Sequence, residues 1–123
     1  MTDEELKKLI KSKVIPALRR VSRWWAPKQD AMRKQKVSPG KYKCQGCGEI
    51  FGQKEISLDH IKAVVNPKVG FVDWNEYILR MFCDSSGFQV LCNDGCHASK
   101  TQTENEIRKK YNKKRKKKLD NSK

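Results

Sequence analysis

The sequence predicts an α+β fold with a helical N-terminal extension and a basic C-terminal helix and tail. Apolar residues between positions 6 and 25 recur every three or four residues, which is the helical period, whereas residues 56–59 alternate as in a short strand. Positive charge is concentrated at both ends, and the five cysteines lie in the middle. We therefore expect a basic helical extension over 1–36, a small core over 37–107, and a basic, flexible tail over 108–123.

The composition limits the size of the core. Of the 123 residues, 34% are charged and 37% are apolar, so we expect one small domain that a disulfide or a bound metal stabilises. No apolar run approaches the length of a membrane span, and the acidic, amphipathic start (MTDEELKKLI) is unlike a signal peptide. The sequence therefore predicts no membrane partner and a cytoplasmic location, where closely spaced cysteines favour zinc over disulfides.

The net charge of +14 is unevenly distributed. Residues 1–36 carry +7, residues 37–100 are neutral overall, and residues 101–123 carry +7. Two basic arms on a neutral core indicate contact with a polyanion, most simply the phosphate backbone of nucleic acid. The alternative is solvated charge that maintains solubility. The candidate phosphate contacts in the tail are Arg108, Lys109, Lys110, Lys113, Lys114 and Arg115.

The N-terminal arm begins with a helix signal. Thr2 and Glu5 form a potential capping box, and Pro16 either kinks one long helix or starts a second one. Trp24 and Trp25 favour packing over stacking on nucleic-acid bases. The Lys and Arg residues between 19 and 36 would leave one face of this arm available to phosphates.

The core is expected to open with a cysteine knuckle and a β-hairpin. The segment SPG (38–40) predicts a turn, and the glycines of CQGCG (44–48) suit a tight knuckle. Residues 56–59 have the pattern of a short strand. We expect this strand and the knuckle to form one hairpin.

Two further helices are predicted. The first covers 73–83 (DWNEYILRMFC), after an irregular loop over 66–72, because Asp73 and Glu76 form a capping box and the apolar residues fall on one stripe. After the apolar segment 88–91, a last helix is expected from His97 into the tail. Nine of the eleven residues 108–118 are positively charged, and their repulsion should fray this helix unless a polyanion is bound.

Two cysteine pairs have the spacing of a metal site. Cys44-x2-Cys47 and Cys92-x3-Cys96 supply four thiolates, the ligand set of a closed structural zinc site. Zinc bound in this way would join the knuckle to the last helix and so stabilise the small core. The alternative is unligated core thiols. Cys83, near the apolar helix, fits that alternative as a packed thiol.

The two histidines of the chain lie beside the elements that zinc would join. His60 follows Asp59 at the end of the predicted strand, and His97 follows a paired cysteine. A carboxylate and an imidazole can hold a divalent ion with open coordination positions, and a neutral imidazole can deprotonate water near neutral pH. The alternatives are a strand-end polar pair bonded to the backbone, and a His97 that caps the helix or faces solvent.

Taken in order, these motifs resemble the HNH endonuclease family. The matching elements are CQGC (44–47), DHI (59–61), QVLC (89–92), CH (96–97) and KT (100–101), and the resemblance covers about residues 42–105. The segment DWNEYILRMFC is also similar to the small HNH proteins of bacteriophages and prophages. The resemblance implies a ββα-metal (His-Me finger) core that docks on DNA.

The resemblance also implies a role for each matching residue. His60 would be the general base that activates water, and Asp59 and His97 would bind a catalytic Mg²⁺ or another divalent ion. Lys100 would contact a phosphate. Structural Zn²⁺ would be held by Cys44, Cys47, Cys92 and Cys96.

The sequence departs from the family pattern at two places. The family's middle asparagine, which orients the general base, has no counterpart, because positions 87 and 88 are glycine and phenylalanine. Asn75 and Asn93 are near but do not match, and a backbone carbonyl is the alternative. The turn CNDGC has one residue more than the usual CxxC, which would shift His97 relative to the zinc.

Three functions follow as hypotheses. The first is a metal-dependent DNA endonuclease that hydrolyses phosphodiester bonds in a bacterial host cell, either beside a phage terminase during DNA packaging or as a homing-type element. The second is a zinc-stapled nucleic-acid-binding module without catalysis. The third is an adaptor that docks on a terminase through the tryptophan-rich N-terminal helix.

Overall fold

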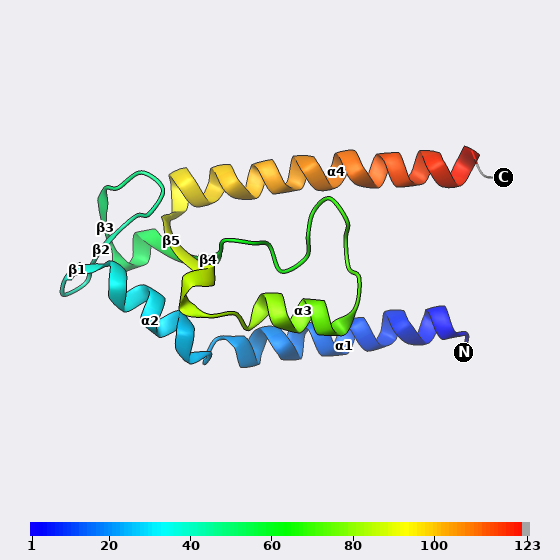
Figure 1. Cartoon of the computed structure of the whole chain (residues 1–123), viewed down its shortest axis with the longest axis horizontal. Helices are drawn as coiled ribbons and strands as arrows, with labels where there is room; N and C mark the ends of the chain where they lie inside the picture. Colours follow the sequence, from blue (N-terminus) through cyan, green and yellow to red (C-terminus); the bar gives the residue numbers. More distant parts are fainter. Residues whose placement is uncertain (122–123) are drawn as a thin grey trace.

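A computed structural model of the chain describes the backbone of residues 1–121 and, within this range, the side chains of residues 1–114. The architecture is α+β, with two small antiparallel sheets and two long helices that extend away from the sheets in the same direction (Figure 1). Helix α1 (Asp3–Ser22) and helix α4 (Ala98–Asn121) follow opposite long edges of the view. The predicted fold class is confirmed at the level of an α+β fold.

The N-terminal arm forms two helices. The Thr2 hydroxyl accepts a hydrogen bond from the Glu5 amide at 3.2 Å, which caps α1 as predicted. Pro16 lies inside α1, which continues beyond it, so a second helix does not start there. Helix α2 (Ala26–Gln35) begins instead around Pro27, whose fixed φ suits the first helical turn.

The two tryptophans at the junction of these helices behave differently. The indole N–H of Trp25 donates a hydrogen bond to the Cys83 carbonyl at 2.7 Å, and its ring meets the edge of Phe82 at a centroid distance of 5.4 Å. Trp24 is 81% exposed. The expected packing role therefore holds for Trp25 alone, which ties the arm to the core.

The first sheet carries the cysteine knuckle. Strands β1 (Lys36–Ser38), β2 (Lys41–Lys43) and β3 (Ile50–Gly52) pair antiparallel in that order. Gly40 turns β1 into β2 with a φ of 75°, a conformation that glycine adopts without steric cost. The expected border between arm and core, at residues 36–37, falls inside β1, so a strand joins the two segments.

The second sheet pairs two strands that are distant in sequence. Strand β4 (Ile56–His60) runs antiparallel to β5 (Phe88–Cys92), with Asp59 opposite Gln89. The strand predicted over 56–59 is therefore confirmed, but its predicted hairpin with the knuckle is wrong. The knuckle belongs to the β2–β3 hairpin, and β4 pairs with β5 because that apolar strand is buried along almost its whole length.

Helix α3 (Trp74–Met81) lies in the long connection between β4 and β5. The Asp73 carboxylate accepts a hydrogen bond from the Glu76 amide at 2.8 Å, so the predicted cap is confirmed. The helix ends before Cys83, slightly earlier than predicted. Residues 61–73 contain no helix or strand, which includes the loop expected over 66–72.

The last helix follows an unusual turn. The segment Asn93–His97 forms one π-helical turn, and α4 begins at Ala98, one residue after the predicted start. A π turn is wider than an α turn, so it accommodates the extra residue of CNDGC before the helix. The backbone of α4 remains helical to Asn121, and the predicted flexibility of the tail stays a prediction.

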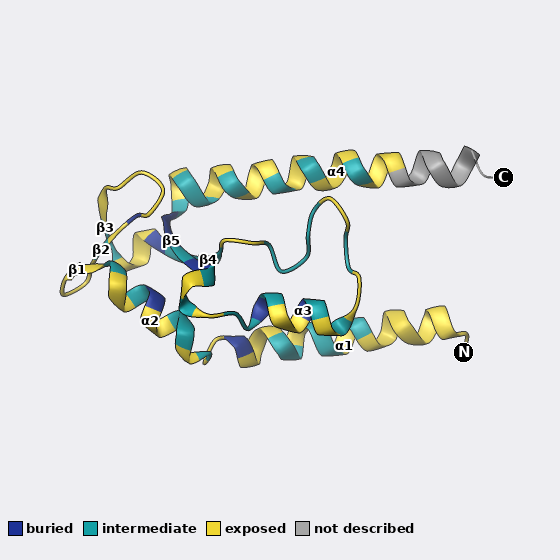
Figure 2. Ribbon diagram, viewed as in Figure 1, coloured by how far each residue is buried: buried dark blue, intermediate teal, exposed yellow. Residues whose placement is uncertain are grey.

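The core is small and centred on β5. Val90 and Cys44 are the largest fully buried side chains, and Phe88, Tyr77 and Met81 are also buried. Figure 2 shows burial concentrated at the second sheet, whereas the N-terminal half of α1 and most of the described part of α4 are exposed. Across the described residues, none of the helices combines the length and the apolar character needed to cross a membrane.

Candidate metal centre and neighbouring polar site

The four paired cysteines converge on one point. Cys44 and Cys47 lie in the knuckle between β2 and β3, Cys92 ends β5, and Cys96 lies in the following π-helical turn. Their sulfur atoms all lie within 4.8 Å of one another. A tetrahedral zinc ion with bonds of about 2.3 Å would hold its sulfurs about 3.8 Å apart. The cluster can therefore hold a metal ion such as zinc, as the spacing predicts.

Main-chain amides surround the sulfurs of this cluster. The amides of Gly46 and Cys92 each lie 3.3 Å from Cys44 Sγ, and the amide of Cys96 lies 3.3 Å from Cys92 Sγ. Burial alone would raise the pKa of the Cys44 thiol, but hydrogen bonds from the amides of Cys47, Cys92 and Gly46 outweigh it and lower the pKa to about 6. The thiolate, which is the form that binds metal, is thus favoured at neutral pH for Cys44. The hydrogen bond with Cys44 raises the pKa of the Cys96 thiol to about 12.

Cys83 lies outside the cluster. Its sulfur packs so closely on Gly87 that a Cβ added to this glycine would stand only 2.5 Å from it. Burial raises the pKa of the Cys83 thiol, which favours the neutral form. These contacts agree with a packed thiol and not with a metal ligand.

The His60 ring is fixed at the end of β4. Its Nε2 lies 2.8 Å from the main-chain oxygen of Met81, and since a carbonyl can only accept, Nε2 carries the hydrogen. The Phe88 ring lies beside the imidazole at a centroid distance of 4.7 Å. Burial lowers the pKa of His60, although the hydrogen bond to Met81 acts in the opposite direction. The neutral ring then has its lone pair on Nδ1, where a general base needs it.

This contact involves the main chain and not an asparagine side chain. The group that orients His60 is the backbone carbonyl of Met81. Asn93 has other partners: its side-chain oxygen accepts a short hydrogen bond from the Ser57 hydroxyl, and its amide nitrogen donates to the Lys54 carbonyl at 3.1 Å. Asn93 therefore fixes the π-helical turn to the start of β4.

Asp59, the residue before His60 in β4, contacts α4. Its Oδ2 accepts a hydrogen bond from the ammonium group of Lys100 at 2.7 Å, and the side-chain nitrogen of Gln89, Nε2, lies 3.5 Å from the same oxygen. The Lys100 ammonium also contacts Glu104 Oε1 at 2.8 Å and the His60 carbonyl at 2.8 Å. Three oxygen atoms thus surround one ammonium group between β4 and α4.

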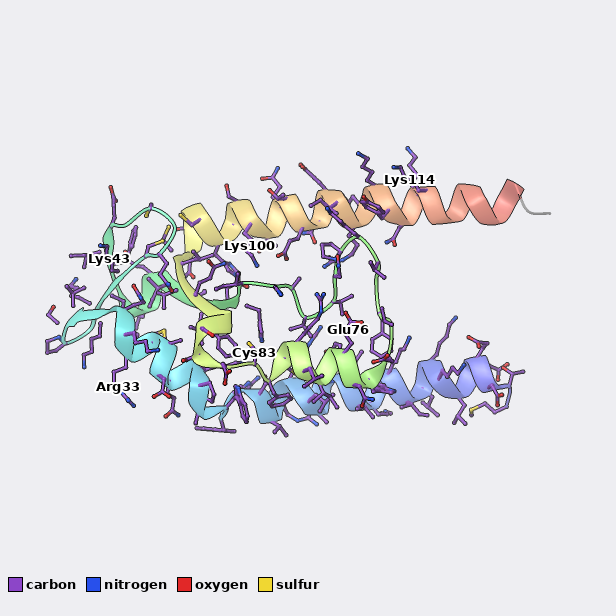
Figure 3. The ribbon with its side chains drawn as sticks, in the orientation of Figure 1. Arg33, Lys43, Glu76, Cys83, Lys100 and Lys114 are labelled. Carbon is purple, nitrogen blue, oxygen red and sulfur yellow. The ribbon has the colours of Figure 1, made fainter. Side chains whose placement is uncertain are left out.

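Figure 3 shows Lys100 on the side of α4 that faces the sheet, whereas Lys114 points away from it. Burial by itself would lower the pKa of the Lys100 ammonium, but the hydrogen bonds to Asp59 and Glu104 outweigh this effect and raise the pKa above its ordinary value. Lys100 is therefore charged and engaged within the protein. In this conformation it is not free to bind a phosphate.

His97 lies apart from the other predicted catalytic residues. It lines a shallow cavity with Thr101 and Lys109 on α4. Among the described residues, the cysteine cluster is the one group of three or more His, Cys, Asp or Glu side chains with ligand atoms within 4.8 Å of one another. The expected meeting of His97 with Asp59 and His60 is therefore not formed in this conformation, in which Asp59 is paired with Lys100.

The basic residues predicted to contact phosphates lie along α4. Exposed positions on this helix are held by Arg108, Lys109, Lys110, Lys113 and Lys114, and the side chain of Arg115 lies outside the described residues. A second basic surface, which we call the α2 groove, lies between α2 and the strands. It has a volume of about 480 Å³, none of its lining residues is acidic, and its cations are Arg23, Lys28, Arg33 and Lys36.

Two parts of this site have little signal in the sequence. The Met81 oxygen belongs to the main chain, so no residue type marks it. Glu104 is marked only by its helical spacing from Lys100, which is common on solvated helices.

Comparison of the chain with protein-family models, curated proteins and solved structures found no match.

Proposed function

We propose that this protein is a metal-dependent DNA endonuclease of the HNH type, in which β4, β5 and α4 form the ββα-metal core. The observation that carries the proposal is the state of His60. Its Nε2 hydrogen is bound to the Met81 carbonyl at 2.8 Å, its Nδ1 is left as a base, and a carboxylate precedes it in the chain. A neutral, oriented imidazole of this kind is the group that proton abstraction from water requires.

The surroundings of His60 support its role as the base. The Met81 carbonyl fixes the tautomer and would stabilise the imidazolium formed when Nδ1 takes a proton. Phe88 restricts the rotation of the ring by packing beside it. The protein thus provides the orientation that an asparagine provides in the HNH pattern.

The oxygen donors around the Lys100 ammonium suit a small divalent ion such as Mg²⁺. Asp59 Oδ2, Glu104 Oε1 and the His60 carbonyl all lie within 2.8 Å of Lys100 Nζ, and carboxylate and carbonyl oxygens are the hard donors that such ions prefer. Asp59 is proposed to hold the ion, whereas His97, the second ligand expected from the sequence, does not form a ligand cluster with Asp59 and His60 in this conformation. When bound, the ion would stabilise the charge on a phosphate and on its leaving oxygen.

The basic surfaces support DNA as the substrate. Exposed cations on α4 and the cations of the α2 groove lie on separate surfaces around the strands, and contacts of this kind bind the phosphate backbone without reading its sequence. A bacteriophage or prophage origin, and action beside a terminase in a bacterial host, are proposed from the resemblance of the motifs alone.

The test is nicking of supercoiled plasmid DNA with Mg²⁺, Mn²⁺ or Ni²⁺. We expect the wild type to nick the plasmid and His60→Ala to be slower by about 100-fold or more, which is the usual contribution of a general base. Equal zinc content and melting temperature of the two proteins would serve as the control for folding. Equal rates would remove His60 from the catalytic machinery.

A second candidate function is a zinc-stapled nucleic-acid-binding module without catalysis. The observation that favours it is the ion pair between Asp59 and Lys100, which engages one of the carboxylate oxygens that a metal would use. Salt-sensitive DNA binding without cleavage in any of the three ions would support this module and refute the nuclease.

A further inference from the structure

The ammonium group of Lys100 occupies a position built for a cation. Its three oxygen partners come from β4 and α4, at 2.7 Å for Asp59 and 2.8 Å for both Glu104 and the His60 carbonyl. The side chains of Lys100, Asp59 and Glu104 are 24%, 20% and 26% exposed, so these charges are partly withdrawn from water. Two carboxylates around one ammonium leave a net negative charge, which the ammonium alone does not balance.

The contacts of Lys100 oppose two functions of the proposed nuclease, metal binding by Asp59 and phosphate binding by Lys100 itself. While Nζ binds Asp59, the carboxylate cannot offer that oxygen to a metal ion, and the ammonium cannot bind a phosphate. Lysine carries a compact charge on a flexible stem of four methylene groups, so its ammonium can move without any movement of α4. The side chain can therefore exchange one anionic partner for another.

We propose that Lys100 is an internal counter-ion that couples DNA binding to metal binding, an inference that rests on the proposed nuclease function. In the absence of DNA, the Lys100 ammonium forms ion pairs with Asp59 and Glu104. A DNA phosphate draws the ammonium away, and the released carboxylates then accept the divalent ion. Lys100 is thus a positioning residue that keeps the metal site closed until substrate is present.

The coupling must be reciprocal. If DNA raises the affinity for the metal ion by some factor, the metal ion raises the affinity for DNA by the same factor. Removal of the ammonium should leave the ion site open at all times. The metal affinity should then rise, and its dependence on DNA should vanish.

The test is calorimetric titration of the zinc-loaded full chain with Mn²⁺. We expect Lys100→Met to bind Mn²⁺ about 10-fold more tightly than the wild type, because a positive charge a few ångströms from the ion is removed from a partly buried site. The matched control is Lys8→Met, which removes the same charge from an exposed position on α1. Solvent and salt screen that charge, so its effect should be less than about 2-fold.

Two further titrations locate the Mn²⁺ site and test its coupling to DNA. In a His60→Ala background, where cleavage is expected to be at least about 100-fold slower, a short DNA duplex should raise the Mn²⁺ affinity when Lys100 is present and leave it unchanged in Lys100→Met. Adding Asp59→Asn to Lys100→Met should abolish the tight site, which would locate it at Asp59. Lys100→Gln, which keeps a polar side chain, repeats the titration with less change in packing.

Mn²⁺ binding by Lys100→Met and Lys100→Gln that is no tighter than that of the wild type would overturn the inference. This outcome is separate from failure of the nuclease. If the wild type cleaves DNA and the Lys100 variants bind Mn²⁺ no more tightly, the nuclease stands and the counter-ion role falls. If no ion supports cleavage but Lys100→Met binds Mn²⁺ tightly at Asp59, the closed ion site stands and the nuclease falls.

Discussion

Gly46 offers a sharp test of the cysteine cluster. It lies in the knuckle between two of the paired cysteines, and its φ is not in the left-handed region, so an alanine at this position would suffer no backbone strain. A Cβ at this position would stand 2.6 Å from Cys96 Sγ, 2.9 Å from Cys96 Cβ and 3.3 Å from Leu91 Cδ2. The substitution Gly46→Ala therefore tests packing against the cluster alone.

The expected loss of stability follows from these distances. Non-bonded heavy atoms rest about 3.5–4.0 Å apart, so the new methyl group would overlap the Cys96 sulfur by about 1 Å. Overpacking of a rigid site costs about 1–3 kcal/mol, and the upper value applies here because a movement of Cys96 also disturbs a metal ligand. A loss of about 3 kcal/mol corresponds to a decrease in melting temperature of about 10 °C for a domain of this size.

The assay combines thermal unfolding with measurement of bound zinc. We expect Gly46→Ala to melt about 10 °C lower than the wild type and to retain less zinc. Gly52→Ala is the matched control in the same hairpin, because a Cβ there would meet its nearest neighbour, Glu55 Oε1, at an ordinary 3.7 Å. If Gly46→Ala kept both its zinc and the stability of Gly52→Ala, the close approach of the knuckle to Cys96 would be refuted.

Three other substitutions test separate parts of the molecule. Cys92→Ser should lose zinc and unfold, whereas His97→Ala should keep its zinc and its circular dichroism spectrum, and an equal loss in both would place His97 in the zinc site. Asp73→Ala should lower the free energy of unfolding by about 1 kcal/mol in urea titration, since it removes the α3 cap, and no change would refute that cap. Arg23→Glu should reduce the salt slope of DNA binding by about 1, more than Lys8→Glu on exposed α1, and equal slopes would exclude the α2 groove.

The knuckle and the cluster explain how so small a core is held. The buried centre consists of little more than β5 and the side chains packed on it. The cysteine cluster joins the β2–β3 hairpin to the end of β5 and to the turn before α4. A metal ion held there would contribute to folding directly, because the unfolded chain has no preformed site.

Local elements of the fold could be predicted from the sequence because their causes are local. The caps at Thr2 and Asp73 depend on a side chain and an amide three residues away, and the period of the apolar residues marks the helices. The cysteine spacing likewise predicts four converging sulfurs, because short loops constrain where the ligands can lie. Strand β4 was recognisable from its alternating pattern, but its partner was not.

Only the tertiary structure decided which distant groups meet. The pairing of β4 with β5 depends on burial of a strand that lies far along the chain, and the partner of His60 is a main-chain oxygen of Met81 that any residue type could supply. The sequence predicted that Lys100 contacts a phosphate. In the structure, its ammonium group is instead paired with two carboxylates on different elements. A sequence specifies the charge and the shape of each side chain, but competition among partners is resolved only when packing sets their distances and their access to water.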